Sequence, residues 1–195
     1  MDVERTDRAS AVAMPLVAGV AGVAALAHVA RPDGLTGEIS YLVALGLASV
    51  LAWLGVAGRD GAGRRPWVWI AAGVTLSFAA DLSSIAMRWT MGSQPDVSGA
   101  DVLWLASYAA LAAGIIRLSP SPSGVDVDAI LDCLVGAVVA LLILWELTLA
   151  EMVGDDSIGW LARAVWAAYP ILDVVLLSLL IRALILHRGS RSTCV

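Results

Sequence analysis

The chain has 195 residues, of which 59% are hydrophobic and 15% charged, and its mean hydropathy is +0.85. Soluble domains are roughly 45 to 50% apolar, so this composition excludes a soluble globular protein and indicates an integral membrane protein. All twelve basic residues are arginine, which excludes chemistry that needs a lysine amine, and the formal charge of -5 singles out no class of partner.

Six apolar segments have the length of membrane-spanning helices, which need ~20 mostly apolar residues. In chain order, we expect helices over about 10–30, 38–58, 66–91, 100–118, 127–153 and 158–187. Short turns rich in glycine and proline separate them and leave no room for a soluble domain. The predicted fold is an all-α polytopic membrane helical bundle over residues 10–187, with a leader over 1–9 and a basic tail over 188–195.

The arginines predict the orientation of this bundle. With the N-terminus inside, nine arginines face the cytoplasm, and only Arg31, Arg88 and Arg163 lie on the other side. The positive-inside rule then places both termini in the cytoplasm. A cleaved signal peptide ending before His28 is the alternative, but the acidic residues of the leader MDVERTDR argue against it.

Charged residues inside the predicted helices are informative because each costs ~2.5 to 3.5 kcal/mol at a helix centre unless it finds a partner. In two antiparallel helices joined by a short turn, residues at equal depth have numbers with a nearly constant sum. This relation places Asp81 level with Tyr108. It also predicts three structural ion pairs: Arg88 with Asp101, Asp132 with Arg182, and Glu146 with Arg163.

Asp81 and Asp173 have no arginine at their level. Each lies about 15 residues, or ~22 Å, from the start of its predicted helix and therefore near the middle of the membrane. Desolvation there favours the neutral acid unless a cation or a hydrogen-bond donor is close. The candidate donors are Tyr108, Tyr169, Ser83 and Ser84.

Pro170 is a second irregularity, one turn before Asp173. Proline removes a backbone donor and leaves the carbonyl of Trp166 without its helical partner. Broken helices near the midplane often form sites in membrane proteins. We therefore predict an intramembrane polar site formed by Asp81, Asp173, Tyr108, Tyr169 and Pro170. The alternative is a kinked helix in which a protonated Asp173 simply bonds to a neighbour.

Nothing in the sequence predicts a cofactor, a metal site or an enzyme. Cys133 and Cys194 have neither disulfide-framework nor zinc-ligand spacing, and His28 and His187 fall at opposite faces of the predicted bilayer. No HExxH motif or Ser-Lys pair is present. The arginines form no stripe, so we expect no nucleic-acid partner.

Several short patterns follow one another over roughly residues 79–187. Ala100 precedes Asp101, Leu131 precedes Asp132, and the run Tyr169-Pro170 is followed by Asp173. In this order and spacing, the chain resembles the multi-helix membrane region that precedes GGDEF and EAL domains in actinobacterial cyclic-di-GMP signalling proteins. It departs from that pattern at Ala109, where the family carries proline after tyrosine, and it contains neither a GGDEF nor an EAL motif.

The resemblance implies a sensory and signal-transduction input module in a bacterial cell membrane, without the diguanylate cyclase or phosphodiesterase that would carry out catalysis. The implied partners are the lipid bilayer, a second copy of the chain, or an associated GGDEF/EAL output domain. In this hypothesis, protonation of Asp173 or Asp81 biases two packings of the helices. The competing hypothesis is a small proton- or cation-coupled transporter that uses the same two acids.

Overall fold

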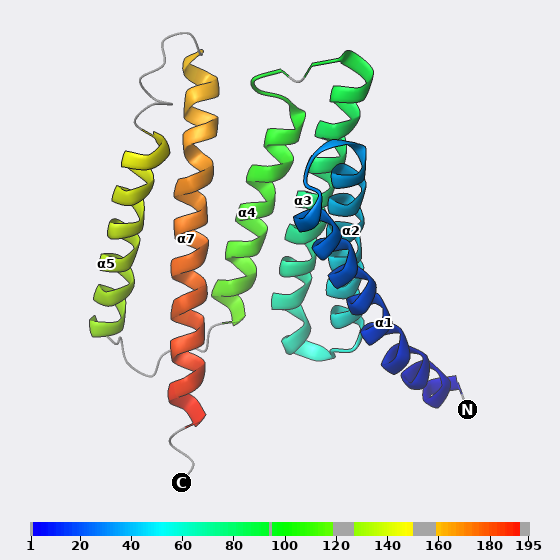
Figure 1. The fold of residues 1–195 in the computed structure, drawn as a ribbon. Coiled ribbons are helices and arrows are strands. Elements are labelled where there is room, and N and C mark those ends of the chain that lie inside the picture. Colours follow the sequence, from blue (N-terminus) through cyan, green and yellow to red (C-terminus); the bar gives the residue numbers. More distant parts are fainter. Residues whose placement is uncertain (1, 94, 119–126, 150–158, 192–195) are drawn as a thin grey trace.

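The computed structural model describes residues 2–93, 95–118, 127–149 and 159–191, and these residues are helical apart from short connections (Figure 1). The α-helices are α1 (Asp2–Ala30), α2 (Gly34–Ala57), α3 (Arg64–Met91), α4 (Gly99–Leu118), α5 (Val127–Leu144) and α7 (Trp160–Arg191). A 3-10 turn over Gly61–Gly63 precedes α3, and a π-helical turn over Trp145–Leu149 follows α5. The predicted all-α fold is confirmed for the described residues.

Four helical segments are long and apolar enough to cross a membrane: Gly34–Ala57, Gly61–Met91, Gly99–Leu118 and Trp160–Leu184. The apolar parts of the other two helices, Met14–Ala30 and Val135–Leu147, are shorter. Helix α1 already begins at Asp2, inside the stretch predicted as a leader. Large apolar side chains such as Leu26, Val102 and Leu184 point outward, as lipid rather than water requires.

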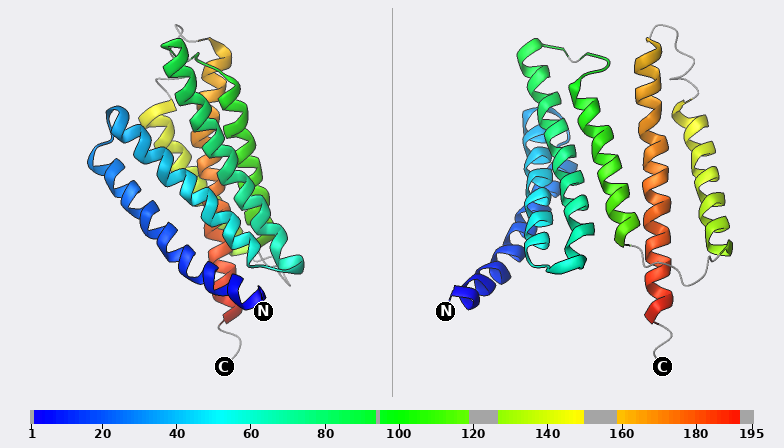
Figure 2. Two further views of the ribbon diagram at one scale, coloured as in Figure 1. Left: turned by 90° about the vertical axis from the view of Figure 1, so that its right-hand side faces the viewer. Right: turned by 180° about the vertical axis from the view of Figure 1, so that it is seen from behind.

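The helices stand side by side in the order α1, α2, α3, α4, α7, α5 (Figures 1 and 2). Helix α7 lies between α4 and α5, although α5 precedes it in the chain. Helices α4 and α7 run in the same direction, and the end of α7 lies at the same end of the molecule as the α2–α3 turn (Figure 1). One side of α4 therefore faces α3 and the other side faces α7.

The contact between α3 and α4 is built from small residues. Ala71 and Ala80 of α3 and Ala100 and Ala110 of α4 are buried. A Cβ atom on Gly73 would lie 2.7 Å from the Leu111 Cγ atom, so the two backbones approach as closely as a glycine allows. Small residues at such a crossing are the usual means of tight helix packing in membranes.

Helix α4 begins with a capping box. The backbone N–H of Ala100 donates to Ser98 Oγ at 3.2 Å, and the backbone N–H of Ser98 donates to Asp101 Oδ2 at 2.7 Å. Two backbone donors at the helix start are thereby satisfied. Asp101 is 6% exposed, so this carboxylate is held in a fixed position at the end of α4.

Candidate functional site

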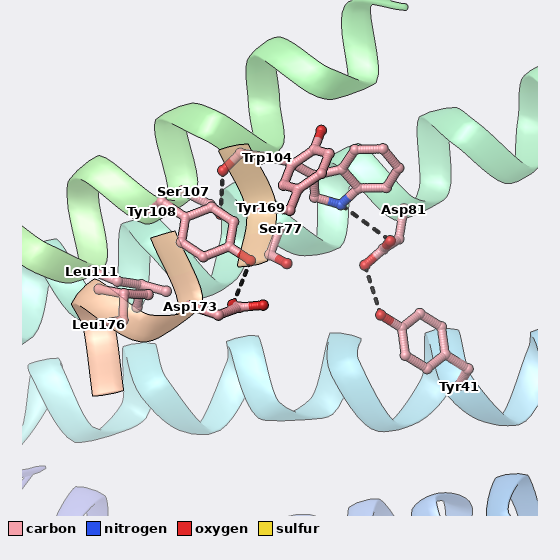
Figure 3. A pocket seen from close by; sticks show the side chains of 10 residues that line it. All are labelled: Tyr41, Ser77, Asp81, Trp104, Ser107, Tyr108, Leu111, Tyr169, Asp173 and Leu176. Atoms are coloured by element: carbon pink, nitrogen blue, oxygen red, sulfur yellow. Dashed lines mark hydrogen bonds between the residues drawn. The ribbon is translucent and has the colours of Figure 1, made fainter. Parts of the chain in front are cut away.

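A polar cavity of about 460 Å³ lies between α2, α3, α4 and α7 (Figure 3). Each of the four helices contributes at least one polar side chain to its wall. The lining residues are Tyr41, Ser77, Asp81, Trp104, Ser107, Tyr108, Leu111, Tyr169, Asp173 and Leu176. The two predicted mid-membrane acids therefore share one cavity.

Asp81 accepts two hydrogen bonds from aromatic side chains on neighbouring helices. The Tyr41 hydroxyl of α2 donates to Oδ2 at 2.9 Å, and the Trp104 indole N–H of α4 donates to Oδ1 at 3.2 Å (Figure 3). Asp81 thus ties α3 to both of its neighbours in the row. Both donors are neutral, and the cation that acts on Asp81 from a distance is Arg88 of the same helix.

Asp173 lies on the open side of the cavity, where its side chain is exposed. The Tyr108 hydroxyl donates to Asp173 Oδ1 at 2.6 Å, from α4 to α7 (Figure 3). In the opposite direction, the Tyr169 hydroxyl of α7 donates to Asp101 Oδ1 of α4 at 2.5 Å. Each of these two parallel helices therefore gives a tyrosine to a carboxylate of the other.

A third polar contact holds the N-terminal part of α7. The Trp166 indole N–H donates to the backbone carbonyl of Asp96 at 2.9 Å, in the connection between α3 and α4. The three contacts join residues separated by 70, 68 and 65 positions in the sequence. This nearly constant separation is the register expected of two parallel helices that lie side by side.

The predicted polar site is brought together in part. Asp81, Asp173, Tyr108 and Tyr169 line the cavity, whereas Pro170 is not among its lining residues. Tyr108 was expected level with Asp81, but it donates to Asp173. Tyr169 was a candidate donor to either mid-membrane acid, and it donates to Asp101. Helix α7 continues as an α-helix through Pro170.

The predicted pair between Arg88 and Asp101 requires correction. Arg88 forms its ion pair with Glu38 of α2, with 2.9 Å between guanidinium Nη2 and carboxylate Oε1, and the Trp89 indole N–H donates to the same carboxylate at 3.1 Å. The Asp101 carboxylate instead accepts hydrogen bonds from the Ser98 backbone N–H and the Tyr169 hydroxyl. The physical reason is the register of α3 and α4, in which Asp81 meets Trp104 and not Tyr108, a displacement of about one helical turn.

The other two predicted ion pairs stay predictions. The side chain of Asp132 lies outside the described side chains, so its pairing with Arg182 is not described. Glu146 lies in the π-helical turn with its side chain exposed, and Arg163 is half-buried on α7.

Sequence reasoning missed Tyr41 and Trp104, the two donors to Asp81. Tyr41 could have been found by applying the constant-sum relation to α2 and α3, which places Tyr41 level with Asp81 across the α2–α3 turn. Trp104 carries no charge, so pairing of charged residues does not point to it, but its indole N–H donates to Asp81 between α3 and α4.

The described residues contain no group of three or more His, Cys, Asp or Glu side chains that could hold a metal ion. No protein-family model, no curated protein and no solved structure matches the chain. Functional interpretation therefore depends on the geometry of the cavity and of the helices around it.

Proposed function

We propose that the chain is a sensory and signal-transduction input module of a bacterial cell membrane, in which the polar contact between α4 and α7 is the moving part. The observation that carries this proposal is the reciprocal pair of tyrosine–carboxylate hydrogen bonds between these helices, one of them in the wall of a cavity. A ligand that contacts Asp173 would compete with a bond that positions α7, and a proton on Asp173 would weaken that bond.

The free energies of the hydrogen bonds between α4 and α7 are small enough for the helices to exchange between two packings. Interhelical hydrogen bonds in membranes contribute on average ~0.6 kcal/mol and at most ~1.7 kcal/mol, so a few of them can exchange between two packings. A signal with different affinities for the two packings shifts their populations. Because α4 packs closely on α3 at Gly73 and Gly114, a change between the two packings would appear as a movement of α7 relative to α4.

Helix α7 is suited to pass this movement on. It runs from the outer end of the cavity to Arg191, beyond the apolar segment that ends at Leu184. The distribution of arginines places that end in the cytoplasm. In the signalling proteins that the sequence resembles, a GGDEF or EAL output domain follows the membrane region at this side.

The functional test joins a GGDEF reporter domain after Val195 and measures cyclic-di-GMP in cells at matched expression. Replacing Asp173 by asparagine removes the charge that Tyr108 solvates, and we expect it to change the nucleotide level at least about twofold. Asp33→Asn is the matched control, since Asp33 lies in the α1–α2 turn outside the cavity. Equal output from the parent fusion, Asp173→Asn and Asp33→Asn would refute the proposal.

The structural test measures distances between spin labels in lipid nanodiscs, in a Cys133→Ser, Cys194→Ser background. Labels at Ile116 of α4 and Leu184 of α7 report the proposed movement, and labels at Leu82 of α3 and Val102 of α4 form the control pair; all four side chains are exposed. We expect the double substitution Tyr108→Phe, Tyr169→Phe to add a second distance to the α4–α7 pair only. An unchanged α4–α7 distance would contradict the proposal.

A second candidate function is a proton- or cation-coupled transporter. It is favoured by the position of Asp81 and Asp173 in one cavity, because transport sites lie near the midplane and use such acids. It predicts flux in proteoliposomes that Asp81→Asn and Asp173→Asn abolish. The sensory proposal predicts no sustained flux from the unsubstituted chain.

A further inference from the structure

We infer that the polar cavity binds a small organic cation of the alkylammonium class, a ligand assignment that rests on the proposed sensory role of the same site. Three features of the cavity support this assignment: two carboxyl groups with no cationic side chain among the lining residues, aromatic walls, and a suitable size.

The first feature is the charge of the lining. Asp81 and Asp173 both line the cavity, and its ten lining residues include no arginine or histidine. The donors that reach the two carboxylates are the hydroxyls of Tyr41 and Tyr108 and the indole N–H of Trp104, all of which are neutral. The nearest guanidinium along α3, that of Arg88, forms an ion pair with Glu38 and attracts Asp81 from a distance, but it does not line the cavity. A cation in the cavity would supply a positive charge that no lining residue provides.

The second feature is the aromatic wall. Trp104 and Tyr169 meet edge to face with their ring centres 6.0 Å apart, and Tyr108 and Tyr169 lie tilted with ring centres 6.2 Å apart. Tyr41 faces them from α2 across the cavity (Figure 3). Aromatic faces within about 6 Å attract an ammonium group, and the attraction is strongest where water is excluded. An aromatic wall beside carboxylates therefore favours a positively charged ammonium group over a neutral group of the same shape.

The third feature is size and ligand chemistry. A volume of about 460 Å³ lies within the range of roughly 300 to 1,000 Å³ that is usual for small-molecule sites. A hard metal ion such as Ca²⁺ requires about six to eight oxygen ligands at short distance. Two carboxylates on different helices do not provide that set, and the described residues contain no cluster of three or more His, Cys, Asp or Glu side chains. An organic cation would fill the volume and contact the rings.

The open side of the cavity gives the ligand a further role. Asp173 is exposed there, and a charged side chain facing hydrocarbon near the midplane costs ~2.5 to 3.5 kcal/mol on insertion scales. A bound cation would lower this cost while contacting Asp173, the acceptor of the Tyr108 bond. Binding is thereby coupled to the contact between α4 and α7.

The experiment titrates the full chain, purified in dodecyl maltoside, with choline by calorimetry, and subtracts titrations into empty micelles. The matched probe is 3,3-dimethylbutan-1-ol, a neutral molecule of the same shape. We expect saturable binding of choline and at least about tenfold weaker binding of the alcohol. Asp173→Asn should weaken choline binding about tenfold without changing the response to the alcohol, and Asp33→Asn should change neither.

Two results would overturn the inference: equal binding of choline and the alcohol, which would show a merely apolar cavity, or no saturable binding of either probe. Because both probes are compared on the unsubstituted chain, a variant that fails to fold does not affect this outcome. The sensory proposal is tested separately. Choline binding without effect on the α4–α7 spin-label distance or on reporter output would support the ligand class and contradict the sensory role.

Discussion

Helix α4 makes two contacts of opposite kind. Toward α3 it presents glycine and alanine, and the two backbones touch with no space for a larger side chain. Toward α7 it presents Asp101 and Tyr108, whose partners are held by hydrogen bonds beside a cavity. The first contact has one packing, because close-packed surfaces do not deform gradually. We propose that the second contact can open without repacking a core, because hydrogen bonds beside a cavity hold it.

We propose that the molecule has a fixed part and a movable part. Helices α3 and α4 belong to the fixed part because their backbones pack closely, and Asp81 joins α3 to α2 and α4 through hydrogen bonds from Tyr41 and Trp104. Helix α7 joins the fixed part through three polar contacts. Variants on the two sides of α4 should therefore differ in kind: those facing α3 should affect stability, and those facing α7 should affect mainly the position of α7.

The largest expected effect is that of Gly114→Leu. A Cβ atom at Gly114 would lie 2.6 Å from Ile70 Cγ1 and 3.1 Å from both the Ile70 nitrogen and the Pro66 carbonyl oxygen. Because two of these atoms are backbone, α3 and α4 must move apart. We expect the free energy of unfolding to fall by about 3 kcal/mol, at the upper end of the usual cost of overpacking. Unfolding in mixed micelles of increasing SDS content measures it.

Gly22→Leu is the control for Gly114→Leu, because a Cβ atom at Gly22 of α1 would meet nothing within 4 Å. It introduces the same side chain into an apolar helix without a clash. An equal loss of stability in the two variants would show that the α3–α4 contact is not the tight one.

The intermediate effect is the coupling between Tyr108 and Asp173. A double-mutant cycle of Tyr108→Phe and Asp173→Ala isolates their hydrogen bond, for which we expect a coupling free energy of about 0.6 to 1.7 kcal/mol. Unfolding of the four variants in the same SDS titration measures the coupling. A parallel cycle of Tyr108→Phe with Glu38→Gln, whose carboxylate bonds to α3, should give no coupling. Coupling of the same size in both cycles would remove the distinction between the two sides of α4.

Much of the fold could be predicted because length and apolar content determine a membrane-spanning helix almost without reference to its neighbours. The expected start of the fourth helix at 100 and end of the third at 91 agree closely with α4 at Gly99–Leu118 and α3 at Arg64–Met91. The predicted depth of Asp81 and Asp173 comes from the same counting and stays a prediction. Their location in one cavity does not come from this counting, because it depends on which helices are neighbours.

The sequence did not predict which helices pack together or how they are aligned along their axes, and the reason is physical. Chain order favours pairing of adjacent helices, but α7 also packs on α4, and two parallel helices leave no turn from which to count. The register of α3 and α4 is set by the close approach at Gly73 and Gly114, which displaces it by about one turn from the equal-depth expectation. That displacement brings Trp104, and not Tyr108, to Asp81. The packing of small residues therefore determines which side chain donates to Asp81, and pairing of charged residues takes no account of that packing.

The smallest expected effect is that of the ion pair between Arg88 and Glu38, which joins α2 to α3 near the predicted outer surface. The two side chains are 42% and 30% exposed, so water and salt screen their attraction. A cycle of Arg88→Gln and Glu38→Gln should give a coupling of about 0.2 to 1 kcal/mol, and it should decrease when the salt concentration rises.

Salt dependence is what separates this ion pair from the cavity bonds. The coupling between Tyr108 and Asp173 involves a neutral donor, so it should be less sensitive to the same change in salt. If the Arg88–Glu38 coupling equalled it at all salt concentrations, the link between α2 and α3 would be as strong as the contact that holds α7. That result would contradict the proposal that α7 moves first, because α2 could then separate from α3 as readily as α7 separates from α4.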